Sequence, residues 1–418
     1  VRFGEEIQAA SEGITVVYGN VSQGTGPCQL RRPDPQIQCH VRRQRRQAPV
    51  AGTVALSVYI KTLLPNYREF SDIRYFTSLM EVAQERRAFP EDFLSPVRIT
   101  FAGGRKLCVG PLICEDSWDD NYPFKPMSYL GNTYDIDLFV NISSSPFTQG
   151  KTERRHRLFG KAIGEIGKPA VYVNCTGIQN NGKNVYTFDG SSSAYDKDGR
   201  LHYECAAFGE ELAIVEYDEQ NHVFTSPVHV NEQHGNTADI YASLHYGLKS
   251  FMGSLGLDHV VIGVSGGIDS AVNAALYATV LPPEHILLVN MPSCYNSEMT
   301  KGLAKELADN LGCLYTVIPV QDSLELTRRQ FSDAALYKND VEAGRLELTS
   351  FIEENIQARD RSSRILAAAA AAFGGVFTCN ANKAESSAAT LRCTATAPAS
   401  WPRRPTCGSI RSTTWPGT

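Results

Sequence analysis

The chain has 418 residues, a formal net charge of −5 and 42% hydrophobic residues, which is typical of a globular protein long enough for two or three domains. This charge balance argues against a general nucleic-acid binder, and we expect no membrane span because no run of 18 apolar residues is free of charge. The 11 cysteines show no CxxC pairs, which favours reduced thiols in the cytoplasm over a disulfide framework or a zinc site.

The first predicted elements are the end of a helix at 5–11 and a strand at 14–20. Residues 28–53 then show neither strand nor helix periodicity. One interpretation of that segment is a basic patch that binds nucleic acid or another anion. We favour the alternative, a solvated and disordered loop.

An alternation of strands and helices follows from residue 54 onward. Strands are predicted at 54–60, 97–101, 107–113, 135–142, 169–175 and 190–196, and a helix is predicted at 151–166. Such an order predicts an α/β sandwich.

Cys114 stands directly after the strand at 107–113 and is followed by Glu115 and Asp116. A cysteine on such a strand-to-helix elbow is a candidate nucleophile, because N–H groups at a helix start lower the pKa of its thiol. The competing interpretation is a small core residue, which describes most cysteines and is favoured when the position is considered alone.

Four motifs of this region together resemble the nitrilase, or carbon–nitrogen hydrolase, superfamily. They are Lys61 with Leu64-Pro65-Asn66-Tyr67, Ile113-Cys114-Glu115-Asp116, Asn141-Ile142-Ser143-Ser144-Ser145-Pro146-Phe147 and Gly190-Ser191-Ser192. The resemblance implies an α-β-β-α sandwich in which Cys114 attacks a carboxamide and Lys61 stabilises the oxyanion and the leaving ammonia. It also implies that glutamine is held by Tyr67, Ser145 and Lys151. The family's general-base Glu lies upstream of the strand at 14–20, and no residue of this chain matches it.

A hydrophilic connector at 216–239 predicts a domain boundary. After an apolar helix at 240–255, a strand at 260–264 leads into the turn Ser265-Gly266-Gly267-Ile268-Asp269-Ser270 and a helix at 270–280. Free backbone N–H groups and the positive helix end make this turn an anion site. Asp269 would repel a phosphate unless a divalent cation lay between them, so the turn predicts a pyrophosphate group with Mg²⁺. A tight turn with an incidental acid is the competing interpretation.

The pattern continues with strands at 286–292, 315–320 and 375–379 and helices at 297–311 and 350–373. It predicts a doubly wound parallel sheet with ligands at the carboxyl ends of its strands. Asp269 and Glu385 both follow such ends, so we expect them to share one Mg²⁺. Arg359 on the long helix is expected to reach a nucleotide phosphate, although a surface charge is the usual role of such a residue.

The turn at 265–270 resembles the ATP-pyrophosphatase, or adenine nucleotide α-hydrolase, superfamily. Met291-Pro292-Ser293, Glu354-Asn355-Ile356-Gln357-Ala358-Arg359 and Asn382-Lys383-Ala384-Glu385 narrow the resemblance to NAD⁺ synthetases. A nitrilase-like domain ahead of such a domain is the arrangement of the glutamine-dependent family. The resemblance implies that deamido-NAD⁺ is bound by Arg359, Mg²⁺ by Asp269 and Glu385, and ATP by Gly263, Val264, Ser265, Gly266, Gly267, Ile268, Asp269 and Ser270.

The implied activity is ATP-dependent amidation of deamido-NAD⁺ to NAD⁺ through an adenylate, with ammonia from glutamine hydrolysis. The implied partners are ATP, deamido-NAD⁺ and glutamine or ammonia, and we expect a homo-oligomer with no nucleic-acid or membrane partner. Two alternatives stay open. One is an amide hydrolase fused to an inert nucleotide domain, and the other is an inactive or ammonia-only remnant of a synthetase.

We therefore expect a nitrilase-like domain at 1–215, a linker at 216–239, an NAD synthetase domain at 240–385 and a disordered tail at 386–418. The tail and residues 28–53 lose periodicity in a way that is typical of out-of-frame translation of a GC-rich gene. We expect two reading-frame disturbances, an incomplete N-terminus and an incomplete synthetase domain. A disordered insert and a disordered tail are the competing explanation.

Overall fold

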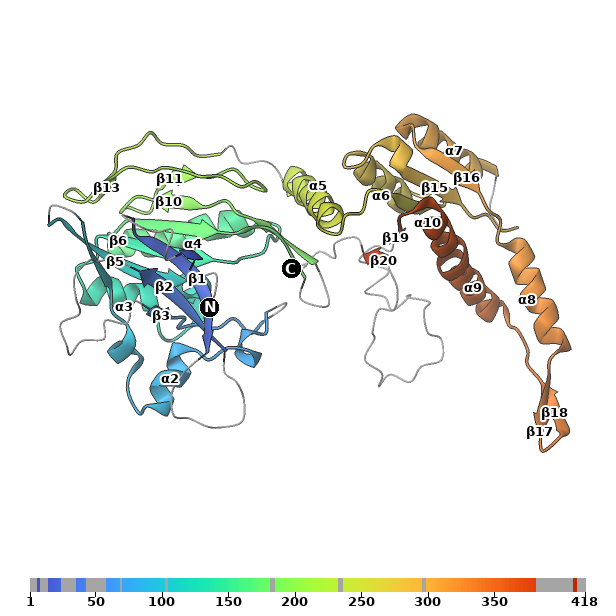
Figure 1. Cartoon of the computed structure of the whole chain (residues 1–418), viewed down its shortest axis with the longest axis horizontal. Helices are drawn as coiled ribbons and strands as arrows, with labels where there is room; N and C mark the ends of the chain where they lie inside the picture. The colour runs from blue at the N-terminus through green and yellow to red at the C-terminus, as the bar shows by residue number, and fades with distance from the viewer. Residues whose placement is uncertain are drawn as a thin grey trace. The chain divides into compact units, whose positions relative to one another are not determined.

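The structure of the chain is a computed structural model. It describes residues 6–7, 14–23, 35–42, 58–67, 70–101, 104–180, 185–231, 236–294, 298–380 and 409–411. Contacts divide the chain into a first unit, residues 1–177 and 187–240, and a second unit, residues 178–186 and 241–418. Each unit has its own β-sheet and its own apolar core (Figure 1).

The first unit is built on a six-stranded sheet with the order β11-β10-β7-β6-β5-β4. The bounds are β4 Val97–Thr100, β5 Lys106–Ile113, β6 Leu138–Ser143, β7 Ala170–Asn174, β10 Ser193–Tyr195 and β11 Leu201–Glu204. The three central strands β5, β6 and β7 are parallel, so their carboxyl ends meet at one edge of the sheet. The segments that follow β5 and β6 carry Cys114, Ser145 and Lys151.

A second, three-stranded antiparallel sheet comprises β1 Val16–Gln23, β2 Pro35–Arg42 and β3 Val58–Ile60. Val17 of β1 packs against the core of the six-stranded sheet. Helices α3 Pro126–Thr133 and α4 Lys151–Ile166 pack on the same core. The predicted nitrilase-like sandwich is confirmed.

Helix α4 shows why this sequence folds locally as predicted. Phe159 and Ile163 are buried and lie four residues apart, so they form one apolar stripe. The helix begins after Gly150 and ends at Gly167, both with a left-handed backbone, which is the usual way for a helix to end at glycine. The predicted and observed bounds of α4 are the same.

Shorter elements complete the first unit. They are α2 Leu79–Glu85, the 3₁₀ turns η1 Asp72–Arg74, η2 Pro90–Phe93, η3 Cys114–Ser117 and η4 Asp119–Asn121, and the hairpin β12 Tyr217–Asp218 with β13 Val223–Phe224. The paired strands β8 Thr176–Asn180 and β9 Val185–Asp189 fall partly in each unit, since residues 178–186 belong to the second. The hairpin β12–β13 lies inside the predicted connector. The Tyr217 hydroxyl donates to the Asp137 carbonyl at 2.6 Å, and Phe224 is buried, so this part of the connector packs on the first unit.

The expected lack of regular structure at 28–53 does not hold for residues 35–42. These residues form β2, which pairs antiparallel with both β1 and β3. The sequence contained the signal, because Ile37, Cys39 and Val41 alternate with polar residues. The other residues of 28–53 lie outside the described part, so the reading-frame disturbance stays a prediction.

The second unit contains a five-stranded parallel sheet with the order β16-β15-β14-β19-β20. The bounds are β14 Val260–Val264, β15 Ile286–Asn290, β16 Leu314–Val317, β19 Val376–Cys379 and β20 Ser409–Arg411. Strand β20 lies in the predicted disordered tail, whose other residues fall outside the described ranges. Its backbone pairs with β19.

Helices cover both faces of this sheet. They are α5 Asn236–Ser254, α6 Ile268–Ala278, α7 Glu298–Leu311, the π-helical segment η6 Asp360–Leu366 and α10 Ala367–Phe373. Helices α8 Gln321–Asp333 and α9 Ser350–Arg359 are linked to each other by the ion pair of Arg328 with Glu353. Val260, Ile262 and Val264 join a core with α5, α6 and α7, whereas Val261 joins a core with η6 and α10. Burial on both faces explains the continuous apolar run of β14 and confirms the predicted doubly wound sheet.

The predicted helix at 350–373 is continuous but passes through the π-helical segment η6. Helix α8, the 3₁₀ turn η5 Pro283–His285 and a hairpin of β17 Ala335–Lys338 with β18 Val341–Arg345 were not predicted. Within the described ranges, every helix is too short or too polar to span a lipid bilayer.

Candidate functional site

Cys114 lies on a strained elbow directly after β5. It begins the 3₁₀ turn η3 and has a φ of +45°, a conformation that costs energy in a residue with a side chain. Asn141 of β6 holds this backbone from the neighbouring strand. Its Oδ1 accepts from the Cys114 N–H at 3.2 Å, and its Nδ2 donates to the Cys114 carbonyl at 3.3 Å. The expected elbow is therefore present, with the half-buried thiol at the carboxyl edge of the sheet.

Lys61 follows β3 and is buried. Its ammonium group forms an ion pair with Asp72 at 3.0 Å. Burial by itself would lower the pKa of Lys61, but the nearby Cys114 and Asp72 outweigh that effect and raise the pKa above its ordinary value. A permanently charged donor therefore lies within electrostatic range of the candidate nucleophile.

Asp116 fastens the segment that carries Lys61 to the elbow. Its Oδ1 accepts the N–H groups of Thr62 at 3.1 Å and Leu63 at 2.8 Å, and its Oδ2 accepts the Ile113 N–H at 3.1 Å. The carboxyl is fully buried, and burial raises its pKa to about 7 against the effect of these donors. Asp116 is thus a positioning residue between two segments that are distant in sequence.

Glu115 is a second buried carboxyl beside Cys114. It accepts hydrogen bonds from the hydroxyls of Tyr67 at 3.1 Å and Tyr122 at 2.9 Å. Burial raises the pKa of Glu115 although both hydroxyl groups act in the opposite direction. The structure therefore brings Tyr67 to the elbow, with its side chain half exposed.

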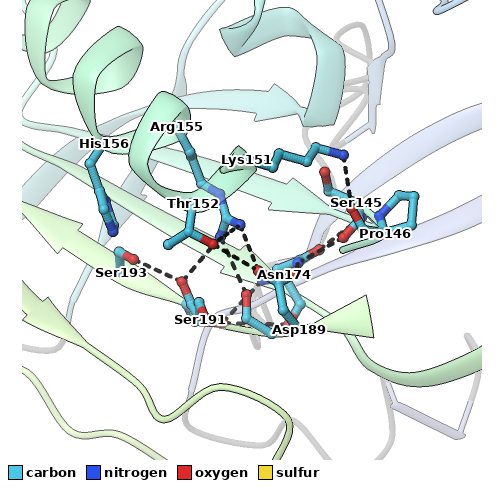
Figure 2. Close-up of polar contacts among 12 residues, drawn as sticks. Ser145, Pro146, Lys151, Thr152, Arg155, His156, Asn174, Asp189, Ser191 and Ser193 are labelled. Carbon is cyan, nitrogen blue, oxygen red and sulfur yellow. Dashed lines mark hydrogen bonds and ion pairs between the residues drawn. The ribbon is translucent and has the colours of Figure 1, made fainter. Parts of the chain in front are cut away.

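Ser145 and Lys151 flank the loop between β6 and α4, and Figure 2 shows both beside Pro146. The Lys151 Nζ donates to the Pro146 carbonyl at 3.0 Å. Asn174, at the end of β7, clamps the Ser145 backbone: its Oδ1 accepts the N–H at 2.8 Å, and its Nδ2 donates to the carbonyl at 3.1 Å. Hydrogen bonds to the main chain of the loop therefore hold the Ser145 backbone and the Lys151 ammonium group, which belong to the two residues expected to bind glutamine.

A buried ion pair is connected to this loop through Asn174. Arg155 of α4 donates from Nη2 to Asp189 Oδ2 at 2.8 Å (Figure 2). The guanidinium lies 4.8 Å from the centre of the Tyr172 ring, and the Asp189 Oδ1 accepts from Asn174 at 3.3 Å. Because a charge without exposure is costly unless it is paired, this network holds its members in one arrangement.

The second candidate site is the turn between β14 and α6. Gly266 has a φ of +82°, and a Cβ there would lie 2.3 Å from the Thr300 carbonyl oxygen, so only glycine fits. The Gly267 N–H donates to Ser265 Oγ at 3.2 Å, and the Ser270 hydroxyl donates to the Gly267 carbonyl at 2.9 Å. Ile268 and Asp269 in the first turn of α6 are exposed, as an anion site at a helix start requires.

The turn lies at the topological switch point of the sheet. Strand β14 pairs with β15 on one side and with β19 on the other, and ligands of doubly wound sheets bind where the strand order reverses. Asn380, after β19, reaches across this point. Its Nδ2 donates to the Gly263 carbonyl at 2.7 Å, and its Oδ1 accepts from Asn273 of α6 at 2.6 Å.

Two protein families match the chain in the same order as these two sites. Residues 51–222 match the carbon-nitrogen hydrolase family, and residues 240–389 match the NAD synthase family. Each model matches one part of the chain, and we call these parts the carbon-nitrogen hydrolase domain and the NAD synthase domain after the models that match them. Both resemblances expected from the sequence are thereby confirmed.

Curated relatives match a larger share of the chain than either family model alone. The chain is 30% identical over 336 residues to a glutamine-dependent NAD(+) synthetase of Synechocystis sp., which covers 78% of this chain and 54% of the relative. A synthetase of the same name from Acinetobacter baylyi is 28% identical over 348 residues, 82% of this chain and 57% of the relative. The chain thus spans about half the length of the curated relatives it matches.

Solved structures of such synthetases are also similar. The glutamine-dependent NAD+ synthetase of Acinetobacter baumannii, in complex with ADP, superposes with a TM-score of 0.72 and 25% identity over 93% of this chain and 65% of that one. An enzyme of the same name from Cytophaga hutchinsonii has a TM-score of 0.64 with 16% identity over 94% and 65% of the two chains. The latter similarity supports the fold.

In the NAD synthase domain, the structure describes two of the residues expected to bind metal or nucleotide, Asp269 and Arg359, but not Glu385. Asp269 is exposed in the first turn of α6, and Arg359 is the exposed last residue of α9. Glu385 lies outside the described residues, so its pairing with Asp269 on one Mg²⁺ stays a prediction. Arg361 was not predicted, yet its Nε donates to the Met291 carbonyl at 3.3 Å, directly after β15.

In the carbon-nitrogen hydrolase domain, sequence reasoning gave no role to Glu115, Asp116 and Asn141. The first two directly follow Cys114, so adjacency to the nucleophile was an available signal. Asn141 begins the quoted motif at the end of β6, but its pairing with Cys114 depends on strand order. Asn174 and Asp189 carried no local signal at all, because only their contacts distinguish them.

Proposed function

We propose that this chain converts deamido-NAD⁺ to NAD⁺ with ATP, using ammonia that its carbon-nitrogen hydrolase domain releases from glutamine. The observation that carries the proposal is the presence of both chemistries in one chain. A Cys114 elbow with Lys61 in electrostatic range precedes a glycine turn at the switch point of a doubly wound sheet. The names of the curated relatives support the same activity.

In the first half-reaction, Cys114 Sγ attacks the side-chain amide carbon of glutamine. The carbon–nitrogen bond breaks, ammonia leaves and a thioester remains, which water hydrolyses to glutamate and the free thiol. The charged Lys61 stabilises the oxyanion of each tetrahedral intermediate. Tyr67, Ser145 and Lys151 hold the glutamine, with Asn174 fixing the loop that presents the latter two.

In the second half-reaction, the nicotinate carboxylate of deamido-NAD⁺ attacks the α-phosphate of ATP and pyrophosphate leaves. The N–H groups of the turn at 265–270 bind this pyrophosphate. Ammonia then displaces AMP from the adenylate and leaves the amide. Arg359 contacts a phosphate of the dinucleotide.

Mg²⁺ belongs to the same proposal. The carboxylate of Asp269 is exposed beside N–H groups that attract an anion, which fits a divalent cation between carboxylate and phosphate. Asp269 and Glu385 would hold the ion, and its charge would neutralise the departing pyrophosphate.

A homo-oligomer in the cytoplasm completes the proposal. The 11 cysteines include no CxxC pair, which favours reduced thiols over a disulfide framework. Light scattering of the purified chain measures the oligomeric state.

The deciding experiment supplies ATP, Mg²⁺ and deamido-NAD⁺ with either glutamine or ammonium, and quantifies NAD⁺ and AMP. With either nitrogen source, we expect one AMP to form for each NAD⁺. Synthesis with ammonium alone would support the ammonia-only alternative, and glutamate release without any NAD⁺ would support a hydrolase fused to an inert domain. Absence of every product would overturn the proposal.

A further inference from the structure

Two histidines lie side by side at the amino end of the parallel sheet in the NAD synthase domain. Strands β14 and β15 are paired in register from Val260 opposite Ile286, so the residues just before them, His259 and His285, are direct neighbours. Their rings are stacked with centroids 4.3 Å apart and planes 17° apart. The turn at 265–270 follows the carboxyl end of β14, so this pair belongs to the opposite edge of the sheet.

Asp258 engages both rings. Its carboxylate Oδ1 lies 2.8 Å from His259 Nδ1, and its backbone carbonyl lies 3.0 Å from His285 Nδ1. One possible ligand atom from each of the three residues falls within 4.8 Å of the others. Ligand atoms of a tetrahedral zinc site with bonds of about 2.0–2.1 Å lie about 3.3 Å apart. The three ligand atoms would therefore need to approach one another only slightly to form such a site.

Further contacts hold both the ring and the backbone of His259. The ring of Phe373, the last residue of α10, meets it edge-on at 5.0 Å and 87°. The Val376 N–H donates to the His259 carbonyl at 3.2 Å, and the backbone of Gly375 approaches so closely that a Cβ would lie 2.3 Å from that carbonyl oxygen. A ring fixed in this way loses little freedom when it binds a ligand.

We propose that Asp258, His259 and His285 bind one divalent transition-metal ion, with zinc as the best match. Two neutral imidazoles and one carboxylate are ligands that zinc prefers, and a water molecule completes a tetrahedral site. Each ring keeps one proton on the nitrogen that does not bind the metal. The ion joins the segment before β14 to the start of β15, so its role is to stabilise this domain, away from the nucleotide turn.

The test is a calorimetric titration of the full chain with Zn²⁺ after treatment with a chelator. We compare the wild type with His285→Ala and with His245→Ala, a matched control whose Nδ1 lies 3.0 Å from the Thr279 hydroxyl. All three proteins share the same cysteines. The wild type and His245→Ala are expected to bind one more equivalent of Zn²⁺ than His285→Ala.

A second variant covers the case in which His285→Ala fails to fold. Asp258 has an exposed side chain (69%), so Asp258→Ala leaves the core intact. We expect the site to weaken by at least about 10-fold, because losing a direct ligand costs no less than losing a group that only orients one. Thermal unfolding with and without Zn²⁺ gives an independent readout, because a ligand of the folded state raises the midpoint. Equal stoichiometry, affinity and Zn²⁺-induced midpoint shift in the wild type and Asp258→Ala would overturn the proposal.

Discussion

The two domains form their candidate sites from different chemical groups, side chains in one and backbone groups in the other. In the carbon-nitrogen hydrolase domain, mostly buried side chains carry the site: Lys61 with the half-buried Asp72, the buried pair Arg155–Asp189, and the carboxyl of Asp116. In the NAD synthase domain, an exposed backbone turn carries it, and side-chain hydroxyls only shape that turn.

The difference follows from the chemistry that each site serves. Covalent attack needs one thiol and one cation in a fixed geometry, which buried and mutually bonded side chains provide. Phosphate binding needs several N–H groups at one point, which a helix start provides without side chains. The first site should therefore be sensitive to the loss of side-chain atoms, and the second to the addition of a single methyl group.

The largest effect is expected for Cys114→Ala. Removal of the nucleophile should lower glutamine-driven NAD⁺ synthesis by at least about 10³-fold, while ammonium-driven synthesis stays near the wild-type rate because the second domain is untouched. NAD⁺ formation with each nitrogen source measures both. Cys108→Ala, on the strand β5 that precedes Cys114, serves as the control and should preserve both activities; loss of both activities in Cys114→Ala would contradict the division of labour.

Asp189→Ala should destabilise the carbon-nitrogen hydrolase domain by about 3 kcal/mol, because it leaves the buried Arg155 charge without its partner. Urea unfolding, followed by tryptophan fluorescence to which Trp118 contributes, measures the change. Glu165→Ala is the control, since its ion pair with Lys161 at 3.9 Å is exposed on both sides and should contribute nothing measurable. An unchanged transition in Asp189→Ala would show that the network is not needed for the fold.

Gly266→Ala tests the opposite sensitivity of the second site. The added methyl group would meet the Thr300 carbonyl in a backbone conformation that alanine disfavours. Displacement of the turn should lower NAD⁺ synthesis about 100-fold with either nitrogen source, whereas glutamine hydrolysis continues. Gly302→Ala on α7, where no atom lies within 4 Å of the new Cβ, should keep full activity, and an equally active Gly266→Ala would refute a role for this turn.

The smallest effect concerns pH and Asp116. Its pKa is raised in the folded state from 3.8 to about 7, so the stability that it contributes is complete below about pH 4 and is lost as the pH rises through 7. The slope for one group is at most about 1.4 kcal/mol for each pH unit. Urea unfolding of the wild type and Asp116→Asn at pH 5.5, 6.5 and 7.5 should show a difference that changes with pH; a constant difference would mean that the carboxyl does not titrate in this range.

Local patterns were sufficient for many elements of both domains, but not for all. The apolar stripe of α4 and its flanking glycines set the helix at 151–166, and the apolar run at 260–264 became β14 with the expected bounds. The alternation at 37–41 was present but overlooked, since Arg-rich flanks suggested an irregular loop. The hairpin of β17 and β18 was missed because its residues are almost all exposed and leave no buried pattern.

The sequence by itself determined which residues are able to take part in catalysis or binding. They are the cysteine after a strand, the lysine ahead of it and the glycine turn before a helix. Only the tertiary structure decided which partners hold them. Asn141 meets Cys114 because β5 and β6 are parallel neighbours, and His259 meets His285 because β14 and β15 are paired in register. Such pairs depend on strand order and register, which arise from packing over the whole domain and leave no trace in the local pattern.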